Sequence, residues 1–458
     1  MTSPSHINVV ILAAGQGTRM KSALPKVLHP LAGVPLVQHV INTSKSLMPR
    51  HINVVYGHGG EQVQQIINDA EINWVLQEEQ LGTGHAVDQV SDYLSDDELV
   101  LILYGDVPLI HIDTLADLLK QGEEGIALLT VHLDNPQGYG RIVRNANGQV
   151  ENITEEKDAS DKIKKIHEVN TGIIAVKASL LKGWLAKLDN ANAQQEYYLT
   201  DIIAMAVNDN YTVHTTHPDN EFEVMGVNNR VQLSELERYY QKEQAKQLMT
   251  DGITLADPSR IDIRGQLTHG KDIFIDVNTV IEGNVTIGNN VSIGANCVIK
   301  DSKIADGVEI LPMSVLDNAS VGKSSKVGPF ARLRPGAVLS DDTHVGNFVE
   351  IKKSFIGTGS KVNHLTYIGD SLVGKKVNIG AGTITCNYDG ANKHQTIIGD
   401  DVFVGSATQL VAPVKIGKNA TIGAGSTITT DVNEDELAVT RVKQKSIKGW
   451  QRPVKEKK

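Results

Sequence analysis

The sequence predicts a two-part chain, in which an α/β domain precedes a parallel β-helix built from six-residue repeats. In the second half an apolar residue returns at every sixth position, for example at Ile398, Val404, Leu410, Ile416, Ile422 and Ile428. Residues 1 to about 227 lack this period and alternate apolar, strand-like runs with helical stretches. That alternation is typical of an open, mostly parallel sheet, whose ligands bind beyond the carboxyl ends of the strands.

The six-residue period excludes an α-helix, which repeats at about 3.6 residues, and a half-buried strand, which alternates at every second residue. Each apolar residue is expected to point into a prism once per side. A glycine directly follows many of them, as in Ile287-Gly288. Such a glycine suits either a corner at positive φ or a close approach of the backbone. Three repeats per coil predict roughly ten coils between Ile263 and Val432, stacked about 4.8 Å apart.

One segment interrupts the period between Thr385 and Ile398. It is a polar run with the sequence Cys386-Asn387-Tyr388-Asp389-Gly390-Ala391-Asn392-Lys393. A polar insertion extruded from a regular solenoid is expected to be functional.

The first domain is placed at residues 1–228, a linking helix at 229–250 and the β-helix domain at 251–458. In the first domain we expect strands at 8–13, 52–56, 72–75, 99–104, 127–131 and 172–176, and helices at 35–47 and 61–69. Leu233, Leu236 and Leu248 lie among charged residues in the linking helix, and Asp251-Gly252 is a plausible stop.

Composition excludes several classes of function. The net charge of −10 argues against general affinity for nucleic acid. Two cysteines provide no disulfide framework, and no apolar stretch approaches the roughly 18 residues of a membrane span. The N-terminus has no signal-peptide pattern, so a cytoplasmic protein is expected. The end from Arg441 to Lys458 is locally basic, and either a solvated tail or a clamp for a phosphate-rich ligand fits it.

A glycine-rich turn follows the first strand, from Leu12 to Met20, with Pro25-Lys26 after it. Its glycine spacing differs from the dinucleotide fingerprint, and it lacks the Gly-Lys-Ser/Thr of a Walker A loop. Small residues and glycines nevertheless let backbone N–H groups approach an anion. Arg19 and Lys26 add positive charge, so the turn predicts a phosphate site.

This turn resembles the sugar-1-phosphate nucleotidyltransferases. Further segments extend the resemblance: Gln77 with Leu81–Ala86, Tyr104–Pro108, Gly138–Arg141, Glu155, Asn170–Gly172 and Asn228. The resemblance implies that UTP and the sugar are bound by Leu12, Ala13, Ala14, Gly15, Arg19, Lys26, Gln77, Gly82, Thr83, Tyr104, Gly105, Asp106, Gly140, Glu155, Asn170 and Asn228. It also implies that Asp106 and Asn228 hold Mg²⁺ and that the loop at Glu196–Tyr198 closes on the sugar. Gln16 departs from the many relatives that carry lysine there.

The hexad domain resembles the trimeric acyltransferases. This likeness implies a left-handed coil and active sites between adjacent prisms, so the loop between Thr385 and Ile398 is expected to reach the site of a neighbouring subunit. That likeness implies His364 as the general base, because an imidazole has an unperturbed pKa of about 6.5, near neutrality. Glu350 is a candidate to orient the imidazole. Glucosamine 1-phosphate is expected to contact Arg334, Lys352, Tyr367, Asn378 and Lys393. Acetyl-CoA is expected to contact Ala381, Asn387, Tyr388, Ser406, Ala424 and Arg441. Since Arg334 and Lys352 are eighteen residues apart, one coil should stack them around an anion.

Together, the two halves resemble the family of bifunctional bacterial N-acetylglucosamine-1-phosphate uridyltransferases and glucosamine-1-phosphate N-acetyltransferases. This resemblance implies a homotrimer that acts on small molecules, away from membranes and nucleic acid. One alternative is a nucleotidyltransferase whose β-helix is not catalytic. Another is a metal site on the prism, for which His269, His344, His364 and His394 are available without clear three-ligand spacing. A non-enzymatic scaffold is the third alternative.

Overall fold

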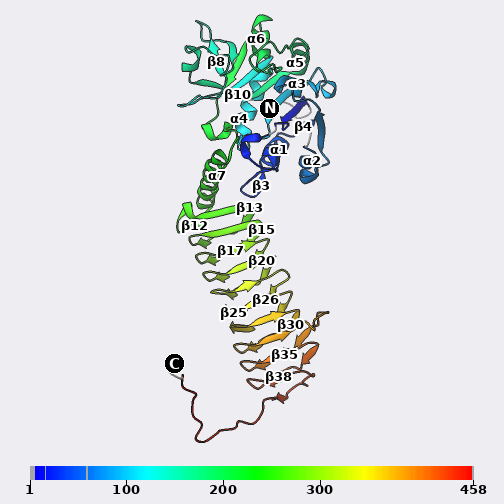
Figure 1. The fold of residues 1–458 in the computed structure, drawn as a ribbon, viewed down its shortest axis with the longest axis vertical. Helices are drawn as coiled ribbons and strands as arrows, with labels where there is room; N and C mark the ends of the chain where they lie inside the picture. The colour runs from blue at the N-terminus through cyan, green and yellow to red at the C-terminus, as the bar shows by residue number, and fades with distance from the viewer. Residues whose placement is uncertain (1–5, 16, 58–59, 456–458) are drawn as a thin grey trace. The chain divides into compact units, whose positions relative to one another are not determined.

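The chain forms two compact units, Met1–Tyr240 and Gln241–Lys458, in a computed structural model that describes residues 6–15, 17–57 and 60–455 (Figure 1). The boundary lies inside helix α7 (Arg230–Thr250), which begins one residue after the predicted start of the linking helix. Gln16 and the last basic residues, Lys457 and Lys458, lie outside the described residues.

The first unit is built on a mostly parallel sheet, as the sequence predicts. Its central path runs in the order β11-β7-β10-β6-β1-β4-β5, and the two short strands β8 and β9 extend it from β10. The strands are β1 (Ile7–Leu12), β4 (His51–Gly57), β5 (Ile72–Gln77), β6 (Leu99–Tyr104), β7 (Ile126–His132), β8 (Arg141–Arg144), β9 (Val150–Thr154), β10 (Glu168–Lys177) and β11 (Val213–Thr216). Strand β10 runs antiparallel to both of its neighbours, β6 and β7. A separate small hairpin joins β2 (Pro30–Leu31) to β3 (Val34–Pro35).

Both faces of this sheet are covered by helices. The helices are α1 (Leu36–Ser46), α2 (Glu61–Ile67), α3 (Thr83–Asp88), α4 (Ile112–Gly122), α5 (Ala178–Leu185) and α6 (Asp201–Asn208). Short 3-10 helices are η2 (Thr18–Met20), η3 (Lys26–Leu28), η4 (Ser91–Tyr93), η5 (Ile163–Lys165), η6 (Glu221–Val224) and, in the second unit, η7 (Pro258–Arg260). Val9 and Ile11 of β1 pack with α1 and α4, whereas Val10 and Leu12 pack with α3, α5 and α6. Alternate residues of a strand point to opposite faces, which explains the unbroken apolar run. No helix in the described ranges is long and apolar enough to span a membrane.

The second unit is a parallel β-helix, which confirms the hexad prediction (Figure 1). One face of the coil consists of β12 (Thr254–Leu255), β14 (Phe274–Ile275), β16 (Ser292–Ile293), β19 (Glu309–Ile310), β22 (Lys326–Val327), β25 (His344–Asn347), β28 (Lys361–His364), β31 (Asn378–Ile379), β34 (Phe403–Val404), β37 (Thr421–Ile422) and β39 (Leu437–Ala438). The remaining strands form one continuous sheet: β13 (Ile261–His269), β15 (Thr279–Ile287), β17 (Val298–Lys300), β18 (Lys303–Ile304), β20 (Val315–Asp317), β21 (Ser320–Val321), β23 (Arg332–Leu333), β24 (Val338–Leu339), β26 (Glu350–Lys352), β27 (Phe355–Ile356), β29 (Tyr367–Gly369), β30 (Ser371–Val373), β32 (Ile384–Cys386), β33 (Thr396–Ile398), β35 (Gln409–Val411), β36 (Val414–Ile416) and β38 (Thr427–Ile428).

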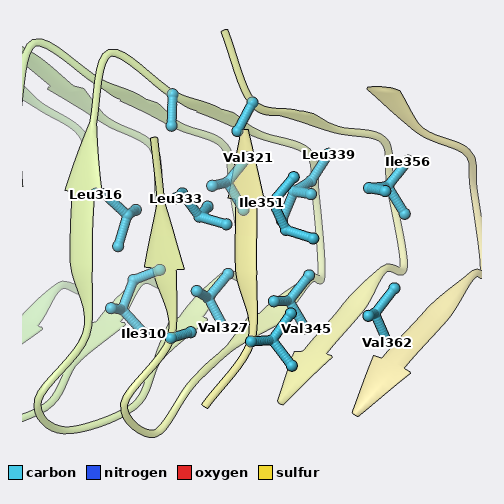
Figure 2. Packing of buried hydrophobic residues seen from close by; sticks show 14 of the residues in the cluster. Ile310, Leu316, Val321, Val327, Leu333, Leu339, Val345, Ile351, Ile356 and Val362 are labelled. Atoms are coloured by element: carbon cyan, nitrogen blue, oxygen red, sulfur yellow. The ribbon is translucent and has the colours of Figure 1, made fainter. Parts of the chain in front are cut away.

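Strand pairing shows how the six-residue period becomes a coil. Leu333 pairs in parallel with Ile351, its equivalent one coil later. The side chains of the repeat point into the interior and stack there (Figure 2). This core runs from Ile253 to Val432, so it begins ten residues before the predicted start at Ile263 and ends where the coils were predicted to end. Burial of one apolar side chain per hexad therefore holds the solenoid together.

The polar insertion leaves the coil where the period fails. Ser371 pairs with Thr396, which lies 25 residues later instead of the 18 between Leu333 and Ile351. Within the loop, Tyr388 and Lys393 form an antiparallel bridge, and the Asp389 carboxylate accepts hydrogen bonds from the backbone N–H groups of Ala391 and Asn392. The coil resumes on the same register of buried residues, so the insertion is extruded without disturbing the core.

Most glycines that follow the apolar residues serve close approach and not positive φ, whereas Gly328, with φ of 104°, is an exception. A Cβ added to Gly288 would lie 2.5 Å from Asp306 Oδ1 and 2.7 Å from the Asp306 backbone nitrogen on the next coil. The left-handed corners are occupied by other residues, including Asn278, Asn290 and Asn296. Asparagine tolerates that conformation better than most residues do. Close approach of the backbone, and not positive φ, is therefore the role of Gly288.

Replacing Gly288 by alanine should lower the free energy of unfolding of the second unit by about 1–3 kcal/mol, because the Asp306 backbone cannot move away easily. Urea unfolding measures this change. The matched control is Gly183→Ala in α5, where an added Cβ meets no atom within 4 Å. An unchanged unfolding curve for Gly288→Ala would contradict the packing argument.

Candidate active sites

A cavity of about 410 Å³ lies at the carboxyl ends of β1, β5 and β6 in the first unit. It is lined by many of the predicted nucleotide-binding residues, namely Leu12, Ala13, Ala14, Gly15, Lys26, Gln77, Gly82, Thr83, Tyr104, Asp106 and Asn228. Val27, Gln80, Ala86 and Glu196 also line it. Parallel strands end at one edge of the sheet, so segments distant in sequence meet there.

The glycine-rich turn is held open toward this cavity. The Gly105 backbone N–H donates to Leu12 O over 2.9 Å, and Gln80 Nε2 donates to Ala14 O over 2.5 Å. Gly17 has φ of 60°, and a Cβ there would lie 2.6 Å from Lys26 Cβ. The turn therefore needs glycine at this position both for its backbone conformation and for space.

Charged groups converge on one point of the cavity. Lys26 Nζ forms an ion pair with Asp106 and lies 3.3 Å from Asn228 Oδ1. Arg19 Nη2 donates to the same Asn228 oxygen over 2.9 Å. The two oxygens predicted to hold a metal thus already share a cation. A carboxylate and an amide oxygen that converge in this way fit Mg²⁺, which prefers oxygen ligands and retains waters.

The opposite wall of the cavity is fastened to the loop before α6. Gln77 Nε2 lies 3.0 Å from His85 Nδ1 and donates to Gly82 O over 3.2 Å. The Gly84 N–H donates to Tyr197 O over 2.8 Å, and the Leu199 N–H donates to Thr83 Oγ1 over 3.1 Å. These bonds hold the loop containing Glu196 against Gly82 and Thr83, which are predicted to bind UTP or the sugar.

A second set of the residues predicted to bind UTP and the sugar lies beside Tyr104. Arg19, Gly105, Gly140, Glu155 and Asn170 do not line the cavity. The Asn170 N–H donates to Gly140 O over 2.8 Å, and a Cβ at Gly140 would lie 3.3 Å from Glu155 Oε1. Burial, with a contribution from the Glu155 charge, raises the pKa of Tyr104 far above its usual value. The structure thus brings these residues together next to the cavity.

In the second unit, His364 lies at the end of β28 beside Asn347 of the preceding coil. Its Nδ1 is 2.7 Å from Asn347 Oδ1. Glu350, the residue considered for orienting the imidazole, instead accepts a hydrogen bond from Arg334 Nη1 over 2.8 Å. The coil register places Asn347, and not Glu350, opposite His364.

The predicted sugar-phosphate residues form a cationic cluster. Leu333 pairs with Ile351, so Arg334 and Lys352 occupy equivalent positions on neighbouring coils, and Glu350 pairs with Arg334. Lys352 lies close enough to Lys393 to lower the pKa of that ammonium. Tyr367 lies near both Arg334 and Lys393. Asn378 lies apart from this cluster on β31, where it pairs with Lys361 of the strand that carries His364.

Four of the predicted acetyl-CoA residues form a column along one corner of the coil. Backbone hydrogen bonds join Gly382 N–H to His364 O, Ala407 N–H to Ala381 O, and Gly425 N–H to Ser406 O, and Arg441 Nη1 donates to Ala424 O over 2.6 Å. The column therefore runs from His364 to Arg441 over four coil steps, about 19 Å.

Asn387 and Tyr388 do not belong to this column. Asn387 Nδ2 donates to Asp370 Oδ2 over 2.5 Å, and a Cβ at Gly369 would lie 2.8 Å from the same nitrogen. Asn387 is thus beside β29, which carries Tyr367. Within one chain the cationic cluster and the column belong to different sides of the coil.

Among the described residues, one group of three potential metal ligands lies close together, and it is in the first unit. It consists of His132, Glu168 and His217. Arg144 donates to both oxygens of Glu168, over 2.8 Å and 2.6 Å, so this carboxylate already has a cation. The described part of the β-helix therefore offers no support for a histidine metal site on the prism.

Both units resemble known proteins. The MobA-like NTP transferase domain matches residues 9–169, the GMPPB C-terminal domain matches residues 263–347, and the bacterial transferase hexapeptide model matches residues 395–430. The bifunctional protein GlmU of Marinobacter nauticus is 61% identical over 452 residues, which cover 98% of this chain and 100% of that protein. The chain belongs to the GlmU family. This membership confirms the predicted family resemblance and the predicted pairing of two transferase domains.

Some functional contacts of this GlmU-family chain were missed from the sequence. Gln80 lies between two predicted segments but carries no motif of its own, and only its bond to Ala14 O places it at the turn. Val27 follows Lys26 directly and lines the cavity as a neighbour of a predicted residue. Asn347 could have been found by counting one coil back from His364.

Glu155 yields a prediction for the stability of this GlmU-family protein. Burial raises the pKa of its carboxyl, the hydrogen bond from Thr200 opposes this, and the charges of Asp201 and Asp158 add to it. A raised carboxyl pKa means that stability is greatest below the unfolded-state pKa and falls as pH rises through the folded-state pKa. Glu155→Gln should therefore raise Tm at pH 8 by about 2 °C and change it little at pH 4.

Differential scanning calorimetry at the two pH values measures this difference. Glu151→Gln, at an exposed position of β9, is the matched control and should leave Tm unchanged at both values. A Tm for Glu155→Gln below that of the unsubstituted protein at pH 8 would contradict the assigned cost of burying the charge.

Proposed function

We propose that this chain makes UDP-N-acetylglucosamine by two successive transfers. The β-helix unit transfers acetyl from acetyl-CoA to the amine of glucosamine 1-phosphate. The first unit then transfers uridylyl from UTP to N-acetylglucosamine 1-phosphate and releases pyrophosphate. The observation that carries the proposal is the presence in one chain of a cavity with Lys26 and Asp106 and of a column from His364 to Arg441. The product would supply precursors of peptidoglycan and lipopolysaccharide.

Uridylyl transfer depends on positioning and charge neutralisation more than on a protein nucleophile. A phosphate oxygen of the sugar attacks the α-phosphorus of UTP in line, its bond to phosphorus forms, and the bond to pyrophosphate breaks. Asp106 and Asn228 would hold Mg²⁺, which supplies positive charge to the reacting phosphates. Lys26, which pairs with both of these side chains, would then turn to the pyrophosphate together with Arg19.

The remaining residues of the first unit would recognise base and sugar. Gln77, Gly82 and Thr83 would contact the uracil, because they form the wall opposite Lys26. Gly140, Glu155 and Asn170 would hold the acetylated sugar behind Tyr104. The loop at Glu196, fastened to Gly82–Gly84, would close over the acetamido group.

Acetyl transfer requires a base for the attacking amine. The amine nitrogen attacks the thioester carbonyl, the C–N bond forms, the C–S bond breaks, and its electron pair remains on sulfur. His364 would accept the proton of the amine and return it to the thiolate. The cluster of Arg334, Lys352, Tyr367 and Lys393 would bind the sugar phosphate, and Asn378 would contact the sugar.

A homotrimer would complete this site. Ala381, Ser406, Ala424 and Arg441 would line the path of coenzyme A, whereas Asn387 and Tyr388 belong to another side of the coil and would serve a neighbouring chain. Exposed apolar residues on four coils support such an association: Met313, Phe330, Phe348 and Leu365. The rings of Phe330 and Phe348 stack at 5.1 Å. An exposed apolar row of this kind is typical of a surface that another chain covers.

Two assays and sedimentation test the proposal. We expect the purified chain to release free thiol from acetyl-CoA only with glucosamine 1-phosphate, to release pyrophosphate from UTP with N-acetylglucosamine 1-phosphate and Mg²⁺, and to sediment as a trimer. Pyrophosphate without thiol would mean a nucleotidyltransferase with a non-catalytic β-helix. If the chain releases neither thiol nor pyrophosphate, both assignments are refuted.

A further inference from the structure

We infer that Asn347 is a positioning residue for acetyl transfer, and that it fixes the tautomer and orientation of His364. The inference rests on the function proposed for the second unit and adds a residue that no sequence motif marks. It follows from the contact between one amide oxygen and one imidazole nitrogen, which lie 2.7 Å apart.

The backbone around this contact is held on both sides. Strand β25 pairs in parallel with β28, with Val345 opposite Val362 and Asn347 opposite His364. The Leu365 N–H donates to Asn347 O over 3.1 Å, so a backbone hydrogen bond joins the two neighbouring coils at this corner. The His364 carbonyl accepts from Thr366 Oγ1 over 2.7 Å and from the Gly382 N–H over 3.3 Å. Both side chains therefore start from fixed Cα positions.

The chemistry of the amide decides which imidazole nitrogen can act as base. An amide oxygen only accepts hydrogen bonds, so His364 Nδ1 must carry the proton and donate it to Asn347 Oδ1. Nε2 then keeps its lone pair and points away from Asn347. With the amide reversed, Nδ1 would accept instead, and the Nε2 of a neutral imidazole would hold the proton. The orientation of the Asn347 amide therefore decides whether Nε2 of His364 has a free lone pair and can act as the base.

No other side chain in the described ranges is found bonded to the imidazole. Glu350 is engaged by Arg334, and the Thr366 hydroxyl bonds to the backbone of His364. The charged or titratable neighbours are His344 on β25 and Lys361 on β28 itself, whereas β31 on the other side contributes Asn378 and Ile379. Neither His344 nor Lys361 supplies an anion, so the neutral amide is the group that orients the ring.

Three variants of the full-length protein test the inference through the kinetics of acetyl transfer. Asn347→Ala should lower kcat by about 10- to 100-fold, while KM for both substrates stays within about twofold. Asn347→Asp keeps an acceptor for Nδ1 and should retain kcat within about tenfold of the unsubstituted protein. Its acid limb in the pH profile of kcat/KM should move to higher pH, because a carboxylate favours the protonated imidazole. Asn284→Ala, at an exposed position of β15, is the control and should match the unsubstituted protein.

The outcomes separate this inference from the proposed function. An active protein whose Asn347→Ala variant keeps full kcat, or loses activity only through KM, overturns the role of Asn347 alone. An Asn347→Asp variant with an unshifted acid limb overturns it as well, and this variant decides the question if Asn347→Ala has a lowered Tm. An unsubstituted protein that releases no thiol from acetyl-CoA overturns the proposed function and this inference with it.

Discussion

Replacing His364 by alanine is expected to lower kcat of acetyl transfer by about 10²- to 10⁴-fold, the usual contribution of a general base. Uridylyl transfer should be unchanged, because the cavity of the first unit is lined only by residues of that unit. His364 is exposed at the start of the column that leads to Arg441, so its loss removes a reactive group without opening the core. Free thiol from acetyl-CoA and pyrophosphate from UTP, measured on one preparation, give both rates.

The matched control for this variant is His269→Ala. His269 lies in the same β-helix, at the end of β13, and 3.8 Å separates its Nε2 from Asp251 Oδ2. It takes no part in the proposed reaction and should leave both rates within about twofold of the unsubstituted protein. Equal acetyl-transfer rates for His364→Ala and His269→Ala would exclude His364 as the base.

Replacing Asp106 by asparagine is expected to lower kcat of uridylyl transfer by about 10²- to 10³-fold and to spare acetyl transfer. The carboxylate pairs with Lys26 and would hold Mg²⁺ together with Asn228. Asparagine keeps the shape but removes the charge, so the Mg²⁺ concentration needed for half-maximal rate should rise. Rates measured over a Mg²⁺ series show both effects.

An aspartate paired with a lysine elsewhere in the first unit provides the control. Asp69 Oδ2 lies 2.7 Å from Lys45 Nζ, away from the cavity, and Asp69→Asn should leave the uridylyl-transfer rate and its Mg²⁺ dependence unchanged. If Asp106→Asn instead shows the Mg²⁺ dependence of the unsubstituted protein, the metal is held by other groups.

The fold of the second unit could be predicted because its signal is repeated. A single apolar residue means little, but Ile398, Val404 and Leu410 at one spacing require a structure with the same period. The role of the glycines could not be settled in this way. Positive φ and close approach both favour glycine, and only the position of Asp306 beside Gly288 distinguishes them.

The first active site could be predicted in large part because its residues lie in short segments at strand ends. The turn after β1 and Asp106 after β6 meet at one edge of a parallel sheet, as the topology requires. Gln80 was missed because its role depends on a contact with Ala14, 66 residues earlier in the chain. No local pattern encodes such a contact.

The sequence alone determined the two-domain architecture, the coil length and the residue types available for phosphate binding, because these follow from period and from local motifs. Only the tertiary structure decided which side chains meet. Glu350 pairs with Arg334 and Asn347 contacts His364, although Glu350 and Asn347 are only three residues apart in the chain. The reason is that a shift of a few residues along a coil moves a side chain to another side of the prism, and strand register fixes that shift.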